Sequence, residues 1–292
     1  TLSESIQSIG MYAFSGNSSM RTVTIKAPIY KLGKNAFSGC EALVEVSLNS
    51  AVIPTGAFRG AKKLEKVTLG KDVAVIGENA FGGTSLKKIT VEAGNTRFKA
   101  GNDLAYILSA DGKTLILVAP ATKGEFYLDG VSTVGAGAFS GNGNITSVTL
   151  PDVTALKPYA FADCTRLASV TLGNLTEIGD YAFARCALTS APSFAHLTEI
   201  GAYAFSGCSA ISEVVIQKTT TTIGDKAFAY TEFNGTLVLP EELISIGSDA
   251  FSGCWRLSGV VEIPENIIAI PSSLFFGCRN IEGIVLHKDV EV

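Results

Sequence analysis

The chain has 292 residues, of which 47% are hydrophobic, and it carries a net charge of -4. Its hydrophobic residues are spread along the chain, and none of its apolar stretches approaches the ~18 residues of a membrane span. Lysine and arginine are scattered, which argues against a nucleic-acid-binding surface. We therefore predict a protein with a large core, no membrane span and no nucleic-acid partner.

From its first residues the chain repeats one short phrase, Ile-Gly-x-x-Ala-Phe-x-x-Cys, with small variations. Successive phenylalanines lie 21 to 24 residues apart, except for one interval of 58 residues. A period of about 20 to 29 residues is typical of leucine-rich repeats. The repeat phenylalanines are Phe14, Phe37, Phe58, Phe81, Phe139, Phe161, Phe183, Phe205, Phe228, Phe251 and Phe275.

Each copy predicts the same local elements. An aliphatic residue stands five positions before the phenylalanine, alanine precedes it in all copies but one, and an alternating segment such as 64–69 or 167–172 follows. That alternation predicts a half-buried strand. We expect the α/β fold class, as a strand-rich leucine-rich-repeat solenoid with one parallel sheet and short helical or 3-10 turns. Residues 1–292 would form a single solenoid domain of about eleven repeats.

One block, near residues 94–124, interrupts the period. Two apolar runs, 104–108 and 114–118, flank Ser109-Ala110-Asp111-Gly112-Lys113. Asp-Gly between β-prone runs predicts a β-hairpin. Insertions in solenoids often lie on a binding face. We favour the simpler interpretation, in which the inserted hairpin extends the sheet and covers core at an irregular turn.

The six cysteines each stand three residues after a repeat phenylalanine, at a position that other copies fill with Asn, Ala or Thr. This position accepts small side chains, which favours a structural role over a disulfide. Spacing typical of zinc ligands is lacking, so we expect no metal and no cofactor. The cysteines are Cys40, Cys164, Cys186, Cys208, Cys254 and Cys278.

The expected strands carry a polar residue between their two inward-facing residues, for example Thr68 and Thr171. In later copies valine takes this outward position, at Val215, Val238 and Val285. The C-terminal half of the strand face is therefore more apolar, and we predict a protein-binding patch at these valines. The alternative is that β-branched residues stand there because they form strands well.

A second candidate site is a stripe of tyrosines, each two residues before the phenylalanine in three consecutive copies. They are Tyr159, Tyr181 and Tyr203. Stacked aromatic rings could hold a sugar or a loop of a partner. We favour the interpretation that these tyrosines pack on one another as part of the repeat.

Catalytic arrangements find little support in the sequence. The two histidines, His196 and His287, lie several repeats apart, which disfavours a Ser-His or Cys-His arrangement. Glu177 and Glu199 occupy equivalent positions in adjacent copies and could form a glycosidase-like carboxylate pair. A repeat generates such ladders by itself, so we predict that the protein is not an enzyme and has no catalytic residues.

The segments 177–183, 204–208 and 147–151 resemble the repeat of the BspA-like leucine-rich-repeat family of bacterial surface proteins. The run 111–116, followed by Ala119-Pro120, is similar to a hairpin of that family. Two stretches depart from the pattern, around Pro192 and around Gly259, and there we expect irregular strand register. The resemblance implies an exported protein, often anchored to lipid or cell wall, and an adhesive role toward host matrix proteins such as fibronectin and fibrinogen.

From these features we predict an extracellular or cell-surface interaction module that binds a protein ligand. A structural spacer that presents another domain and a carbohydrate-binding module are the alternatives. Neither end of the chain resembles a polar cap, and uncapped solenoids expose strand edges. We therefore also expect that the chain is part of a longer protein, or that copies of the chain associate end to end.

Overall fold

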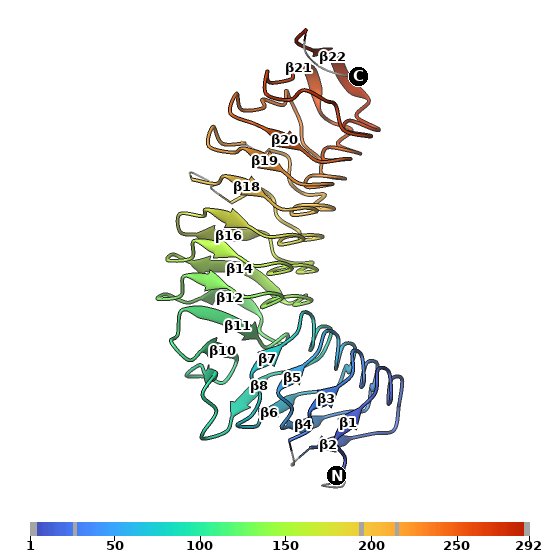
Figure 1. Ribbon diagram of the computed structural model, residues 1–292, viewed down its shortest axis with the longest axis vertical. Coiled ribbons are helices and arrows are strands. Elements are labelled where there is room, and N and C mark those ends of the chain that lie inside the picture. The colour runs from blue at the N-terminus through green and yellow to red at the C-terminus, as the bar shows by residue number, and fades with distance from the viewer. Residues whose placement is uncertain (1–4, 26–27, 193–195, 214–215, 289–292) are drawn as a thin grey trace. The chain divides into compact units, whose positions relative to one another are not determined.

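A computed structural model describes residues 5–25, 28–192, 196–213 and 216–288. The chain divides into two compact units, residues 1–124 with 134–144 and residues 125–133 with 145–292. Within each unit one repeat makes one coil, and strands of successive coils lie side by side (Figure 1). A single coil cannot bury its apolar side chains, so stability comes from stacking on the neighbouring coils.

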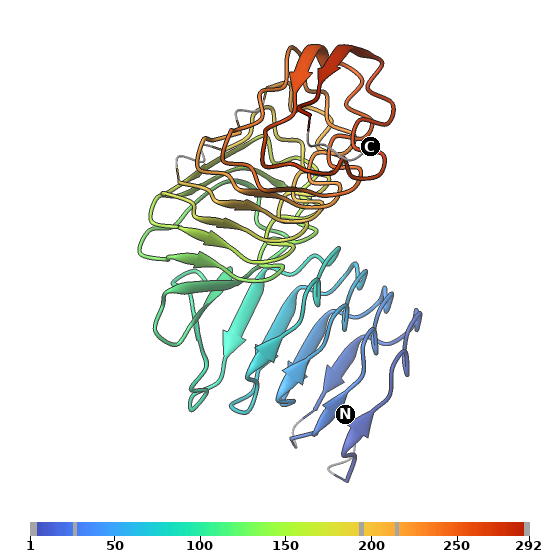
Figure 2. The same ribbon diagram turned by 45° about the horizontal axis from the view of Figure 1, so that its top comes forward.

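In the first unit, four strands form a parallel sheet in the order β2-β4-β6-β8, which Figure 2 shows as one row. Each strand runs in register with the next, so that Thr24 pairs with Ser47 and Ser47 pairs with Thr68. The outward polar ladder expected from the sequence is thereby confirmed in this unit. The strands of this unit are β1 (Ser8–Ile9), β2 (Thr22–Thr24), β3 (Lys31–Leu32), β4 (Glu45–Leu48), β5 (Val52–Ile53), β6 (Lys66–Leu69), β7 (Val75–Ile76), β8 (Lys88–Val91), β9 (Phe98–Ala100), β10 (Tyr106–Ser109) and β11 (Thr114–Val118).

In the second unit, five short strands pair in parallel in the order β15-β17-β18-β19-β20. A second set, β14 with β16 and β21 with β22, follows the phenylalanine in its repeat. The strands are β14 (Ile145–Leu150), β15 (Ala155–Leu156), β16 (Ser169–Leu172), β17 (Glu177–Ile178), β18 (Glu199–Ile200), β19 (Thr222–Ile223), β20 (Ser245–Ile246), β21 (Ser258–Glu262) and β22 (Asn280–Val285). In sequence, β12 (Gly124–Tyr127) and β13 (Thr133–Val134) lie at the boundary between the units.

The Ala-Phe turns use a hydrogen-bond pattern that excludes a helix. The N–H groups of Ala36, Ser38 and Cys40 each donate to the carbonyl three residues earlier. The alternate N–H groups, of Phe37 and Gly39, donate to the following coil at 2.8 Å. An α-helix requires every N–H to bond four residues back within its own segment. Consecutive turns of this kind therefore link coil to coil.

The expected α/β class and the helical or 3-10 turns are accordingly wrong, because the residues that the structure describes form strands, turns and bends but no helix. The expectation of one parallel sheet is also wrong. Each repeat offers two strand positions, one before its phenylalanine and one after it, so the described strands form several sheets. The fold is a parallel β-solenoid.

The repeat phenylalanines form the centre of the core in both units. Phe37 and Phe58 stack with ring centroids 5.2 Å apart, and Phe183 stacks in the same way on Phe161 and Phe205. All five side chains are almost completely buried. Alanine precedes most of these rings because the position is enclosed in the stack, as at Ala182, which favours a small side chain.

The glycine of the Ile-Gly pair allows adjacent coils to approach closely. A Cβ atom added at Gly33 would lie 2.3 Å from the backbone of Gly10. Real Cβ atoms do not approach backbone so closely, so this position requires glycine or a displaced neighbouring coil. The repeat therefore selects glycine here for packing between coils.

The predicted hairpin at residues 94–124 is confirmed. β10 and β11 pair antiparallel around Asp111-Gly112, and β9 adds a third antiparallel strand. Gly112 has a φ of 75°, which favours glycine. Ile107 and Leu115 are fully buried, so the hairpin contributes to the core of its unit, as the favoured interpretation required.

Candidate functional site

The tyrosine stripe is a continuous column in the second unit. The rings of Tyr159 and Tyr181 stack with centroids 4.7 Å apart, and those of Tyr181 and Tyr203 with centroids 4.4 Å apart. Lys226 Nζ lies 5.7 Å from the centroid of Tyr203, and it also lies 3.9 Å from the carboxylate of Asp249. The equivalent position of five successive coils thus forms one line of ring, ring, ring, cation and anion.

The rings of the column pack on one another from coil to coil. A tyrosine binds a sugar ring through an exposed aromatic face. Here Tyr181 has both faces covered by neighbouring rings, and one face of Tyr203 carries the Lys226 cation. Burial raises the pKa of the Tyr181 hydroxyl, and the neighbouring tyrosines add to this effect. These contacts support a structural role for the stripe.

The three tyrosines also adopt a backbone conformation that bulky residues rarely adopt. Their φ angles are between 56° and 60°, and other copies place Asn35 or Gly56 at the same position. The left-handed region costs a non-glycine residue roughly 1–2 kcal/mol. Ring stacking offsets this cost, because stacked aromatic pairs contribute about 0.5–1.5 kcal/mol beyond their buried area.

The candidate valines occupy the outward face of their coils where the structure describes them. Val238 has 75% of its surface exposed, and it stands between the buried Leu237 and Leu239. Val285, in β22, is 50% exposed and pairs in register with Glu262 of β21. Val215 lies outside the described residues. The predicted apolar patch is thus interrupted by a carboxylate between its two described valines.

The irregular register expected around Gly259 is confirmed. Strands β21 and β22 shift register between Gly259 and Val260, and Gly259 has a φ of 74°. On this side of the second unit β16 ends at Leu172 and the next strand that the structure describes, β21, begins at Ser258. Between these two strands, the described part of the chain forms only an isolated parallel bridge on this side, from Gly235 to Leu257.

A groove opens between the coils on this side, in the part of the chain between β16 and β21, with a volume of about 870 Å³. Ligand pockets in proteins range from about 300 to 1,000 Å³. The groove is lined by residues of adjacent coils, which are Glu213, Ile216, Gln217, Lys218, Phe233, Asn234, Thr236, Leu237, Val238, Leu239, Pro240, Glu241, Glu242 and Leu257. Sequence analysis found Val238 of this groove and missed its other residues, because nothing in the repeat phrase describes the space between two coils. The signal that could have found it is the interval from Phe228 to Phe251, which is one residue longer than the interval from Phe161 to Phe183.

The cysteine position is structural. The thiols of Cys186 and Cys208 donate to the carbonyls of Phe161 and Phe183, each in the preceding coil, at 3.0 and 2.9 Å. None of the six cysteines forms a disulfide, and burial raises the pKa of the Cys186 and Cys208 thiols well above its usual range. In the described part of the chain, no group of three or more His, Cys, Asp or Glu side chains is placed to hold a metal ion.

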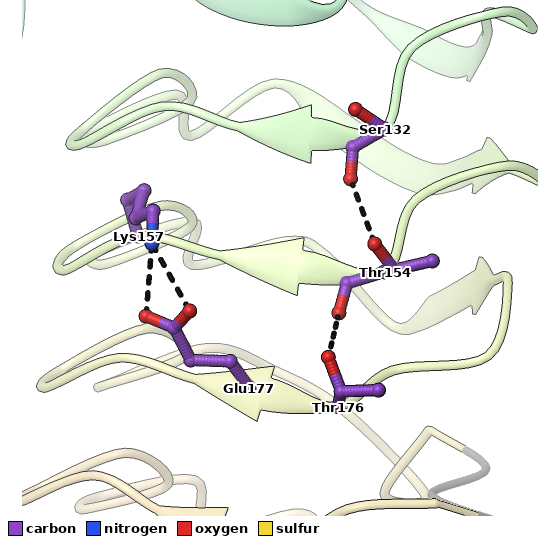
Figure 3. Close-up of polar contacts among 5 residues, drawn as sticks. All are labelled: Ser132, Thr154, Lys157, Thr176 and Glu177. Atoms are coloured by element: carbon purple, nitrogen blue, oxygen red, sulfur yellow. Dashed lines mark hydrogen bonds and ion pairs between the residues drawn. The ribbon is translucent and has the colours of Figure 1, made fainter.

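The Glu177 and Glu199 ladder is present, since the two residues pair in register in β17 and β18. Lys157 Nζ lies 3.0 Å from both carboxylate oxygens of Glu177, and Figure 3 shows this ion pair beside a ladder of hydroxyls. In that ladder Thr176 Oγ1 donates to the Thr154 carbonyl at 3.2 Å and Thr154 Oγ1 to the Ser132 carbonyl at 3.4 Å. The carboxylate thus belongs to contacts that join one coil to the next.

Parallel strands, stacked phenylalanines and coil-to-coil turns together define a leucine-rich-repeat β-solenoid. The chain belongs to the family described as BspA type leucine rich repeat region, whose model matches residues 1–102, 132–258 and 234–292. The resemblance noted in the sequence is confirmed. Within the described ranges, no helix is long and apolar enough to cross a membrane.

Two solved structures are similar in fold. The pneumococcal vaccine antigen PcpA matches at 20% identity and a TM-score of 0.50, over 99% of this chain and 68% of that protein. A leucine-rich repeat protein from Eubacterium ventriosum matches at 20% identity and a TM-score of 0.56, over 85% of this chain and 80% of that protein. No curated protein sequence matches the chain. At these identities the likeness concerns the fold alone.

Proposed function

We propose that this protein is a non-enzymatic module that acts at a bacterial cell surface and binds a protein ligand, in an adhesive role toward host or neighbouring-cell proteins of the extracellular matrix type. Family membership supports a surface protein. The observation that carries the binding role is the groove beside Val238, whose size is that of a ligand pocket and whose walls combine apolar and charged side chains.

The contacts of the other candidate residues support a role without catalysis. Glu177 is held by Lys157, the cysteines donate to backbone carbonyls, and the tyrosine faces cover one another. Each of these side chains serves the stack of coils. The groove differs because Val238, which lies beside it, exposes an apolar side chain to solvent.

The proposal is tested with an array of matrix proteins, including fibronectin and fibrinogen, and a parallel glycan array. We expect the purified chain to bind a matrix protein, and we expect Val238→Asp to weaken that binding while the triple variant Tyr159→Ser, Tyr181→Ser and Tyr203→Ser retains it. Glycan binding that the triple variant loses would instead support a carbohydrate-binding module. A lack of binding on both arrays would overturn the binding function in favour of a structural spacer.

A further inference from the structure

We infer that the groove beside Val238 binds an extended, basic segment of a partner polypeptide, with alternate apolar side chains directed into the groove. This inference rests on the proposed function and specifies the chemistry of the ligand.

Two backbone hydrogen bonds join the coils on either side of the groove. Asn234 N–H donates to the Ser212 carbonyl at 3.0 Å, and Ile244 N–H donates to the Thr221 carbonyl at 2.8 Å. Of the lining residues, those within 213–218 and 236–242 lie between these bonds in the sequence, whereas Phe233 precedes them and Leu257 belongs to the next coil. The two coils are thus joined on both sides of most lining residues, and the volume between them suits a segment of chain that lies across it.

One wall of the groove has the burial pattern of a strand although it lies outside the described strands. Leu237 and Leu239 are 6% and 8% exposed, and Val238 between them is 75% exposed. This period of two indicates extended backbone. Extended ligands bind beside such segments through their main chain and place alternate side chains in pockets.

The inner surface of the groove is apolar. Phe233 and Leu257, together with Leu237, line it and are nearly buried, while Val238 stands exposed at the opening. Because the first three side chains are already nearly buried, the apolar surface that a ligand can still cover is mainly that of Val238, and its burial supplies about 25 cal/mol per Å². A ligand that lacks apolar side chains would leave this surface without a matching group.

The rim selects the charge of the ligand. Three glutamates, Glu213, Glu241 and Glu242, line the groove with only Lys218 as a cation. Within the described part of the chain, none of these three carboxylates forms an ion pair. Negative potential at the rim favours lysine or arginine in the bound segment and disfavours acidic residues.

The direct test uses a blocked synthetic peptide of alternating lysine and valine, labelled for fluorescence anisotropy. Matched peptides alternate glutamate with valine, or lysine with serine, and an additional version places proline at every second position. We expect the lysine-valine peptide to bind at least about 10-fold more tightly than each of the others, which corresponds to about 1.4 kcal/mol. Binding should weaken as salt rises, because the charged groups at the rim are exposed.

Variants then locate the bound peptide. Val238→Asp and the double variant Glu241→Lys, Glu242→Lys should each weaken binding of the lysine-valine peptide by about 10-fold or more. Val75→Asp and Glu92→Lys make the same changes at exposed positions of the first unit and should change the affinity less than about twofold. Circular dichroism checks that all four variants are folded.

Equal affinity for the acidic and basic peptides, or binding that survives both groove variants, would overturn the inference. The same variants applied to a matrix protein found on the array separate the two proposals. If that protein binds Val238→Asp normally, the adhesive function stands and the groove is not its site. If no matrix protein on the array binds while the peptide binds through Val238, the groove is a peptide-binding site and the adhesive function is overturned.

Discussion

Phe183 shows how a single residue of the repeat serves both its own coil and its neighbours. Its ring is fully buried, and its centroid lies 5.2 Å from that of Phe161 and 5.3 Å from that of Phe205. One side chain therefore fills core that belongs to three coils. Truncation at this position leaves a cavity that the stack cannot close without moving whole coils.

We expect Phe183→Ala to lower the free energy of unfolding by about 3–5 kcal/mol, through lost burial and the resulting cavity. Urea denaturation followed by circular dichroism measures the change. Phe276→Ala is the control, because Phe276 is 70% exposed and its loss should cost less than about 0.5 kcal/mol. An unchanged unfolding midpoint for Phe183→Ala would contradict the role of the phenylalanine column.

At Cys254, burial raises the pKa of the thiol from 9.0 to about 12. The thiol donates to the Phe228 carbonyl at 3.1 Å in the preceding coil. Because the folded pKa exceeds the unfolded one, the contribution of the thiol to stability is complete below about pH 9 and is lost as pH rises through the folded pKa.

The stability gap between the native protein and Cys254→Ala should therefore be constant up to about pH 9. It should then shrink by about 1.4 kcal/mol per pH unit toward about pH 12. Urea unfolding of both proteins at about pH 8 and about pH 10.5 measures the gap. The comparison removes the titration of lysine and tyrosine, which both proteins share. A gap that is the same at both values would show that the thiol is not buried as described.

At the scale of the element, the tyrosine column couples three coils through ring stacking. Replacing Tyr181 by asparagine keeps a residue that tolerates positive φ but removes two stacked pairs, each worth about 0.5–1.5 kcal/mol. We expect Tyr181→Asn to lower the free energy of unfolding by about 1–3 kcal/mol more than the control variant Tyr230→Asn does.

The control is Tyr230→Asn, since Tyr230 has a φ of 60° but is 64% exposed and lies outside the column. Thermal unfolding by differential scanning calorimetry measures both variants. Equal losses of stability for Tyr181→Asn and Tyr230→Asn would show that ring stacking contributes nothing beyond the effect of the positive φ. Greater stability of Tyr181→Asn would mean that the strain at this position exceeds the gain from the rings.

At the scale of the whole molecule, apolar side chains exposed along β22 offer a surface for association of copies. Ile284 and Val285 are 46% and 50% exposed, and an outward strand of this kind can pair with another chain. Net charge is small, which weakens repulsion between copies near the isoelectric point of about 5.3.

We therefore expect concentration-dependent association that increases as pH approaches about 5.3 and decreases near neutral pH. Sedimentation velocity over a range of concentrations measures it. Val285→Asp should suppress the association, while Val75→Asp, at an exposed position of β7 in the first unit, should not. A monomer at all concentrations and both pH values would contradict this prediction.

The sequence by itself determined the repeat, the coil that each repeat forms, the hairpin at Asp111 and the structural role of the cysteine position. These features are periodic or local, and periodic burial and short turn signals can be counted along a chain. It also indicated that Val238 faces outward, because strand residues alternate between faces.

Only the tertiary structure decided how the Ala-Phe turns are bonded. The N–H of Phe37 donates to the next coil instead of to its own turn, so the turns are not helical as expected. No local sequence pattern predicts this bonding. The groove beside Val238 was also decided there, because it lies between the coils that carry Ile216 and Leu237, which two backbone hydrogen bonds join. Repeat periodicity describes each coil without describing the space between two coils about twenty residues apart in the sequence.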